Sequence, residues 1–402
     1  MKTIGIIAEY NPFHNGHAWQ LTEAKRRTGA DFAVVVMSGD FVQRGEPAMT
    51  DKHTRAKMAL LGGADLILEL PVQYACGSAE YFSRGACTLL QRIGVIDTLC
   101  FGCEDEKPAA FASLSAFLAC EPPMFREHLR KFLAAGNSFP KARLLALEVC
   151  LDDNAKIDDA RTLLSSPNNT LGLEYLTACR RLGCSFDVLP IKRQGAGYHC
   201  DTPKGIFASA TAIRKDLSLA ESYIPAQSLS ILQQAIQSHG IQKADNFSAV
   251  LHYALLTHRD YTAFLDVNSD LSDRIRKLLP EFISWNQFVT LLKTKQMTEA
   301  RIRRCLLHIL LSIRKEPIKK DRFTGLSYAR VLGFRKSALP LLGEIKKKSC
   351  IPLITRAADG KKLLTGQELE QFSLNLNASA IYHAVLPQTV PYNEYKKQVL
   401  RI

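Results

Sequence analysis

Two histidines, His14 and His17, lie three residues apart in a short polar loop near the N-terminus. Imidazole groups in such a loop can donate hydrogen bonds to phosphate oxygens, which stabilises the charge that grows on the α-phosphate and the departing pyrophosphate in adenylyl transfer. An isolated histidine is more often a structural residue, and a metal site is a further alternative, but no third ligand follows at a familiar spacing. We therefore predict phosphate chemistry at this loop and no metal site.

A second group of polar residues, Ser209, Thr211 and Arg214, has the spacing S-x-T-x-x-R at the start of a predicted helix over 209–217. Hydroxyls and helix N-terminal amides can hold phosphate oxygens, and an arginine one turn later adds positive charge. The alternative is an ordinary N-cap followed by a surface arginine. The pattern by itself is compatible with both interpretations.

The histidine loop is preceded by a continuous apolar run at residues 4–8. Such a run is typical of a strand that is covered on both faces, as in a parallel sheet. Turn-forming residues occupy 11–16, and helical spacing then continues to Gly29. A strand, a loop and a helix in this order place the histidines at the carboxyl edge of the sheet, where α/β folds bind ligands beside a helix N-terminus.

The alternation of strands and helices continues along the first half of the chain. The patterns predict strands at 31–37, 64–70, 98–101 and 186–191, and helices at 51–61, 78–93 and 166–182. Consecutive strands are too far apart for hairpins, which implies right-handed crossovers and a parallel sheet with both faces covered. We predict an α/β fold whose sheet is complete near Ser218.

The remaining segments are predicted to be mainly helical. Residues 108–151 have a helical pattern broken at Pro122 and Pro123, and the acidic stretch 152–159 is interpreted as a loop. Beyond Ser218, helical spacing recurs and two short strands are possible. The helices are expected at 226–256, 270–279, 285–292 and 299–313, and the strands at 350–355 and 361–364.

The positive charge of the chain is concentrated in one region. Residues 271–350 hold 19 Lys and Arg against 6 Asp and Glu, a net charge of +13 that equals the net charge of the whole chain. Regional basicity indicates a nucleic-acid substrate, although a solvated helical surface is the alternative. Tyr328 and Phe334 either stack on unpaired bases or belong to the core. The basic residues singled out are Arg301, Arg303, Arg304, Arg314, Lys315, Lys319, Lys320, Arg322, Arg330, Arg335 and Lys336.

The composition is that of an ordinary globular protein, with 47% hydrophobic and 23% charged residues among 402. No apolar run reaches about 18 residues and no signal peptide is evident, so we expect a cytoplasmic protein that does not associate with membranes. The 11 cysteines are scattered through apolar segments, as expected for reduced thiols. Cys100 and Cys103 form a lone C-x-x-C whose first member lies within a strand, so zinc or redox chemistry is not expected there.

The motifs resemble those of a known family. His14-Asn15-Gly16-His17 resembles the H-x-G-H signature of the HIGH-type nucleotidyltransferases, and the surrounding string AEYNPFHNGH is similar to one branch, the bacterial tRNA(Met) cytidine acetate ligases. Residues 209–214 resemble the second nucleotidyltransferase signature, of the type S-S/T-x-I-R, although Ala208 and Ala210 stand where hydroxyls are frequent. Segments 167–172 and 192–199 also resemble the acetate ligases.

This resemblance implies a function and two domains with different roles. Residues 1–218 would form a Rossmann-like, ATP-binding catalytic domain, and residues 219–402 a mainly helical, basic region that binds tRNA. The enzyme would convert ATP and acetate into acetyl-adenylate and pyrophosphate, and Mg²⁺ is expected with ATP as for most triphosphate substrates. The acetyl group would then pass to N4 of the wobble cytidine of elongator tRNA(Met).

The resemblance also implies roles for individual residues. His14, His17 and Arg214 would stabilise the transition state, and Arg193 would contact ATP together with Asn168 or, as second choice, Asn169. Gly102 would let a backbone approach the adenosine, since glycine has no Cβ. The full set implied to bind ATP is Ile7, Ala8, Glu9, Tyr10, Asn11, Pro12, Phe13, His14, Asn15, Gly16, His17, Gln20, Gly102, Asn168, Asn169, Arg193, Ser209 and Thr211.

Two other functions are compatible with the residues themselves. A small-molecule adenylyltransferase would account for the histidines but not for the basic region. The other is an RNA-binding protein whose nucleotide site is regulatory rather than catalytic. The sequence defines no protein partner.

Overall fold

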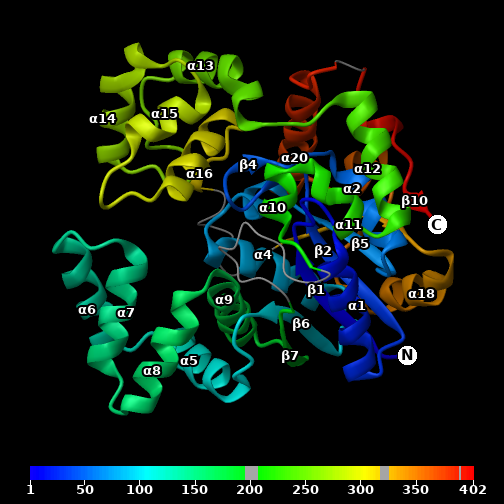
Figure 1. Ribbon diagram of the computed structural model, residues 1–402, viewed down its shortest axis with the longest axis horizontal. Helices are drawn as coiled ribbons and strands as arrows, with labels where there is room; N and C mark the ends of the chain where they lie inside the picture. Colours follow the sequence, from blue (N-terminus) through cyan, green and yellow to red (C-terminus); the bar gives the residue numbers. More distant parts are fainter. Residues whose placement is uncertain (195–206, 317–325, 389–390) are drawn as a thin grey trace.

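The computed structural model of the protein describes residues 1–194, 207–316, 326–388 and 391–402 (Figure 1). Its strands are β1 (Thr3–Ala8), β2 (Phe32–Ser38), β3 (Phe41–Val42), β4 (Glu46–Pro47), β5 (Leu66–Leu70), β6 (Thr98–Cys103), β7 (Asp187–Lys192), β8 (Ala329–Phe334), β9 (Leu353–Ile354) and β10 (Leu400–Arg401). Among the described residues, the main sheet has the order β10-β8-β5-β2-β1-β6-β7, with β9 paired to β8, and β3 and β4 form a separate hairpin.

The centre of the main sheet is parallel. Strand β1 pairs in parallel with β2 and β6, β2 pairs with β5, and β6 pairs with β7. Ile6 of β1 thus lies between Val35 and Cys100. The predicted α/β fold with a parallel sheet is confirmed, and the carboxyl ends of these five strands lie along one edge.

The sheet also takes strands from the later part of the chain. Strand β8 pairs antiparallel with β5, and β9 and β10 pair in parallel with β8. The prediction that the sheet is complete near Ser218 is therefore wrong. Arg330 is one of the basic residues singled out in the sequence, but its side chain is 1% exposed and pairs with Glu394, and the rest of 329–334 is a continuous apolar strand.

Helices cover both faces of the sheet, which explains the continuous apolar pattern of its strands. Val34 and Val36 of β2 face one layer, and Ala33 and Val35 face the other. The first layer contains α4 (Ala79–Arg92), α5 (Pro108–Cys120), α9 (Pro167–Leu182) and α18 (Leu339–Lys348). The second contains α1 (Asn15–Thr28), α2 (Lys52–Leu61), α10 (Ala210–Lys215) and α12 (Ala226–His239).

Two helical groups extend from this core on the same side of the molecule in Figure 1. The first continues from α5 and consists of α6 (Pro123–Ala134), α7 (Phe139–Cys150) and α8 (Asn154–Ser165). The second has its own hydrophobic core around Phe247 and Trp285. It consists of α13 (Ser248–Thr257), α14 (Ser269–Leu278), α15 (Trp285–Leu292) and α16 (Glu299–Leu310). The predicted helical character of 108–151 and of these later segments is confirmed.

Two local predictions are wrong. The acidic stretch 152–159 is not a loop, because α8 begins at Asn154, where the Asp153 side chain caps it by accepting a hydrogen bond from Ala155 N at 2.9 Å. Residues 361–364 do not form a strand, because they end helix α19 (Ala357–Leu363), whose Gly360 packs on the Phe372 ring of α20 (Gly366–Ala384). Within the described ranges, no helix is long and apolar enough to cross a membrane.

Candidate active site

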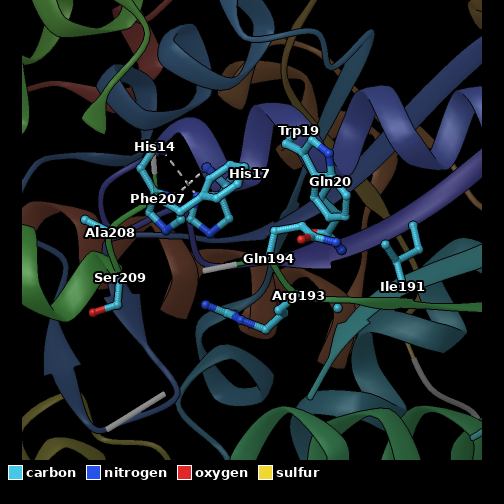
Figure 2. A pocket seen from close by; sticks show the side chains of 12 residues that line it. His14, His17, Trp19, Gln20, Ile191, Arg193, Gln194, Phe207, Ala208 and Ser209 are labelled. Atoms are coloured by element: carbon cyan, nitrogen blue, oxygen red, sulfur yellow. Dashed lines mark hydrogen bonds between the residues drawn. The ribbon is translucent and has the colours of Figure 1, made fainter. Parts of the chain in front are cut away.

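A pocket lies at the carboxyl ends of β1, β6 and β7, where the sequence places the histidine loop. It has two connected compartments that share a wall formed by the His14, His17 and Arg193 side chains, among others. Figure 2 shows both imidazole rings, Arg193 and Ser209 around the first compartment, with Trp19 and Ile191 on its other side. The fold therefore brings residues from three separate parts of the chain into one site.

The two histidines form a reciprocal cap at the start of α1. Their rings stack with centroids 3.7 Å apart. His14 Nδ1 accepts a hydrogen bond from Gly16 N at 3.1 Å, and His17 Nδ1 accepts one from His14 N at 3.3 Å. Gly16 is required here, since a Cβ would lie 2.9 Å from the His14 ring. Because each Nδ1 is an acceptor, the proton of each neutral ring is on Nε2, which is available to donate.

Burial and nearby positive charge keep both rings neutral. Burial, with Arg193 and Arg214, lowers the pKa of His14 to about 3. Burial, with His14 and Arg193, lowers the pKa of His17 well below its ordinary value. Two neutral imidazoles can donate hydrogen bonds to an anion without first gaining a proton. The pair therefore suits the stabilisation of phosphate charge.

Two arginines add positive charge to the same wall. Arg214 is held by its donation to Asn11 O at 2.6 Å and to Thr211 Oγ1 at 3.3 Å. Burial lowers the pKa of Arg193 and Arg214, yet a guanidinium stays charged in proteins. Ser209 caps α10 by accepting from Ala212 N at 3.0 Å, and its own hydroxyl proton can still be donated. The S-x-T-x-x-R element thus combines an N-cap with a pocket wall.

Most of the predicted ATP-binding residues line the pocket. They are Ile7, Ala8, Glu9, Tyr10, Asn11, His14, Gly16, His17, Gln20, Gly102, Asn168, Arg193, Ser209 and Thr211, together with the predicted catalytic Arg214. Four predicted residues are not part of this lining: Pro12, Phe13, Asn15 and Asn169. Phe13 is fully buried in the core, and Asn15 donates to Ser222 O at 3.3 Å. The loop residues 195–199 fall outside the described residues.

The two neighbouring asparagines have different environments. Asn168 lines the pocket and donates to Glu104 Oε1 at 2.6 Å. Asn169 is fully buried, and its Oδ1 accepts from the backbone N–H of Glu104 at 2.9 Å and of Asp105 at 3.2 Å. Asn169 therefore fastens the start of α9 to the end of β6, which is a structural role.

Several pocket residues were not predicted from the sequence. Trp19, Ile191 and Phe207 line the first compartment, and Gln43, Arg44, Phe82, Leu171 and Tyr175 line the second. Phe82 and Tyr175 lie within helices at positions indistinguishable from core positions, so no local pattern marks them. Gln43 and Arg44 belong to the β3–β4 turn, which Glu9 Oε1 holds by accepting from Gln43 N at 2.8 Å.

The basic region does not form one surface. Arg303 of α16 pairs with Glu46 at 3.2 Å, beside the turn that lines the pocket. Helix α18, whose last turn contains Lys346, Lys347 and Lys348, lies instead near the N-terminus, at the amino end of the sheet (Figure 1). Tyr328 and Phe334 are 1% and 5% exposed, so the stacking interpretation is wrong and both belong to the core. Lys319, Lys320 and Arg322 fall outside the described residues.

The C-x-x-C cysteines are buried thiols. Burial raises the pKa of both Cys100 and Cys103 to about 12, so neither readily forms a thiolate. No group of three or more His, Cys, Asp or Glu side chains suited to a metal ion occurs among the residues that the structure describes.

Comparison with known proteins agrees with this geometry. Residues 1–398 match the family model of the HIGH Nucleotidyl Transferases, the class that this fold and histidine pair define. Within this class, the chain belongs to the tRNA(Met) cytidine acetate ligase family. It is 39% identical over 388 residues to the tRNA(Met) cytidine acetate ligase of Thermoanaerobacter sp. (strain X514), covering 95% of each chain. It is 34% identical over 409 residues to that of Clostridium acetobutylicum, covering 100% of each.

Solved structures show the same fold. The crystal structure of apo Thermotoga maritima TmcAL superposes with a TM-score of 0.94 at 30% sequence identity, covering 100% of both chains. A second crystal structure of that protein, bound with alpha-thio ATP, superposes with a TM-score of 0.92. The predicted family and fold class are thus confirmed.

Proposed function

We propose that this protein uses ATP and acetate to form acetyl-adenylate and then acetylates N4 of the wobble cytidine of elongator tRNA(Met). The observation that carries the proposal is the neutral, stacked His14–His17 pair on one wall with Arg193 and Arg214. The relatives named tRNA(Met) cytidine acetate ligase, and the neighbour bound with alpha-thio ATP, support the identity of the substrates.

The first step is an attack of an acetate oxygen on the α-phosphorus of ATP. The new P–O bond forms as the bond to the bridging oxygen breaks, and pyrophosphate leaves. His14 and His17 donate from Nε2 to the phosphate oxygens, and Arg214 and Arg193 balance the growing negative charge. Donors that are already oriented and buried act without reorganisation, which is why their burial favours catalysis.

The second step is an attack of the exocyclic N4 of cytidine on the acyl carbon. The new C–N bond forms, AMP leaves, and N4 loses a proton to solvent or to AMP. No covalent bond between the protein and the acetyl group is required. The task of the protein is to hold the two substrates in contact and to exclude water from the mixed anhydride.

Mg²⁺ would enter with the triphosphate, because it is commonly bound by substrate phosphates and one or two carboxylates. Glu9 is the carboxylate among the described residues of the pocket wall and fits this role. When bound, the ion would neutralise charge on the phosphates.

We assign the ATP chemistry to residues 1–218 and the tRNA contact to the basic part of residues 219–402. In support, the pocket is lined by residues between Ile7 and Arg214. Helix α16 lies next to the β3–β4 hairpin, so a tRNA on the α14–α16 group would be adjacent to the pocket. Because tRNA and ATP are cytoplasmic, we also place the reaction in the cytoplasm.

Radiolabelled acetate, incubated with ATP, Mg²⁺ and bulk tRNA, tests the proposal. We expect label in tRNA, and N4-acetylcytidine after digestion to nucleosides. Label in an adenylate alone would favour a small-molecule adenylyltransferase, and binding of ATP and tRNA without turnover would favour an RNA-binding protein with a regulatory nucleotide site. A variant with both His14→Ala and His17→Ala should lose acetate-dependent pyrophosphate release, and retention of that release would show that the assigned chemistry is wrong.

A further inference from the structure

The second compartment of the pocket has an apolar end that ATP chemistry does not require. This end is lined by Ile7 of β1, Phe101 of β6, Phe82 of α4, and Leu171 and Tyr175 of α9. The polar side chains that line the compartment include those of Arg214, Thr211 and Asn11. A compartment with one polar and one apolar end fits a small amphiphilic substrate.

The first compartment is the better place for the adenine ring. Its distinct lining includes Trp19, Ile191 and Phe207, and the Trp19 and Phe207 rings meet edge to face with centroids 6.2 Å apart. Flat aromatic and aliphatic walls suit a purine. With adenosine there, the α-phosphate lies at the shared wall beside His14 and His17, and the acceptor of the adenylyl group must approach from the second compartment.

The side chains at the apolar end are held in place by close packing. Phe82, Phe101 and Tyr175 are 2%, 3% and 5% exposed, and their ring centroids lie 6.5 Å apart for Phe82 and Tyr175 and 5.9 Å apart for Phe101 and Tyr175. Gly172 lets α9 lie directly on the Phe101 ring, since a Cβ there would be 2.2 Å from that ring. Asn169 fastens the same turn of α9 to β6.

A rigid apolar wall in the second compartment limits the length of the acyl chain that the compartment can hold. The carboxylate end of the substrate is drawn to the positive side of the compartment by Arg214, and its carbon chain points toward the apolar end. Leu171 is half-buried, whereas the three rings are at most 5% exposed, so its side chain can be shortened with the least repacking. It is the residue of this wall best placed to set the chain length.

We propose that Leu171, together with Phe82 and Tyr175, forms an acyl-chain subsite that admits a two-carbon carboxylate and excludes longer ones. This inference rests on the proposed function and specifies which part of the chain selects the carboxylate. A pocket distinguishes carboxylates that differ by one methylene by about 10–200-fold. Shortening a side chain of this wall should therefore change the selectivity between acetate and propionate by a factor within that range.

The experiment compares acetate, propionate and butyrate as substrates of the full-length protein with ATP and Mg²⁺, measured as carboxylate-dependent pyrophosphate release. We expect Leu171→Ala to raise the ratio of kcat/KM for propionate to that for acetate by about tenfold or more. Phe82→Leu provides a second enlargement of the same wall. Binding of ATP and a cooperative thermal transition establish that each variant is folded.

A matched truncation in the first compartment, Trp19→Ala, serves as the control. It should raise KM for ATP and leave the propionate-to-acetate ratio unchanged. An unchanged ratio in both folded wall variants, with wild-type protein active on acetate, would overturn the acyl subsite alone. Absence of carboxylate-dependent pyrophosphate release from the wild-type protein would instead overturn the proposed function and the subsite with it.

Discussion

Lys52 forms a buried ion pair with Glu394, whose Oε1 atom lies 3.2 Å from the lysine Nζ atom. A Glu69 carboxylate oxygen lies 2.9 Å from the same Nζ atom. The side chains of Lys52 and Glu69 are 0% and 1% exposed. The backbone N–H of Lys52 also donates to Asp40 Oδ1 at 2.7 Å, so the cluster joins a loop at the carboxyl edge of the sheet to the C-terminal segment.

We predict that Glu394→Gln lowers the free energy of unfolding by about 3–5 kcal/mol, because Glu394 pairs with both Lys52 and Arg330 and its removal leaves one of these two buried cations uncompensated. Urea denaturation at pH 7 measures the change. The control is Glu370→Gln, at an exposed position of α20, which should alter the free energy of unfolding by less than about 0.5 kcal/mol. Equal stabilities of the two variants would show that the pair contributes little.

The same cluster predicts a pH dependence of stability. Burial alone would raise the pKa of Glu394, but Lys52 and His53 hold it well below its ordinary value. A carboxyl whose pKa is lower in the folded than in the unfolded state contributes its full amount to the free energy of unfolding above its unfolded pKa of about 4.3. This contribution is lost progressively as the pH falls below that value. The unfolding free energy of the wild-type protein should therefore fall more steeply below about pH 4.5 than that of Glu394→Gln, and parallel curves would contradict this.

The pKa of about 3 for His14 predicts that its ring stays neutral through the physiological range. A histidine with a lowered pKa is neutral at every pH above that value, so the ring C–H proton signals of His14 should not move between pH 8 and pH 5. Proton NMR of the free protein checks this, with His14→Asn used to assign the signals. A titration with a midpoint near the ordinary value of about 6.5 would refute the neutral assignment.

The same substitution separates the two roles of His14. Asparagine is a good N-cap and can replace the Nδ1 acceptor, but it does not carry the Nε2–H donor to the same place. We expect His14→Asn to lower kcat for acetate-dependent pyrophosphate release by about 10²–10³-fold, as for loss of one oxyanion donor, with little change in unfolding free energy. An unchanged kcat in a folded variant would show that His14 does not take part in the reaction.

Asn168 and Asn169 offer a matched pair of adjacent substitutions. Asn169→Ala leaves the backbone N–H groups of Glu104 and Asp105 without their acceptor, which should lower the free energy of unfolding by about 2–4 kcal/mol. Asn168→Ala removes a pocket side chain, so we expect it to raise KM for ATP with a stability change below about 1 kcal/mol. Urea denaturation and steady-state kinetics on both variants measure this, and the reverse pattern would contradict the assignment.

The division of the basic region predicts where tRNA binds. Lys293 and Lys295 are exposed in the segment that leads into α16, and Lys346 and Lys348 are exposed on α18 near the amino end of the sheet. Charge reversal of the first pair to Glu should raise KM for tRNA several-fold and reduce its salt dependence. The same reversal of the second pair is the control, and an equal effect there would mean that tRNA contacts the opposite end of the molecule.

The position of the histidine loop could be predicted from sequence because its signals are local. A continuous apolar strand, turn formers and a helix stop all lie within residues 4–29, and the fold places that loop where the order of elements requires. The two histidines were therefore located correctly at the pocket, as were Arg193, Ser209 and Arg214 from their positions after a strand and at a helix start.

The remaining features depend on contacts between distant parts of the chain. Strand β8 was not predicted because its pattern contains Arg330. A charged residue is compatible with this buried strand only because Glu394 lies beside it. Phe82 and Tyr175 line the pocket because α4 and α9 pack side by side against the sheet, and neither helix pattern distinguishes a pocket wall from a core. Asn169 resembled a ligand contact because only its burial separates it from Asn168.

The position of β8 between β5 and β10 has a consequence for synthesis of the protein. The histidine loop emerges early from the ribosome, whereas Arg330 and Glu394, which enclose the Lys52 cluster, emerge late. A nascent chain must keep the β5 edge unpaired until β8 has been translated. An exposed edge strand is a template for pairing with other chains, so emergence of β8 from the ribosome removes one such edge from the nascent chain.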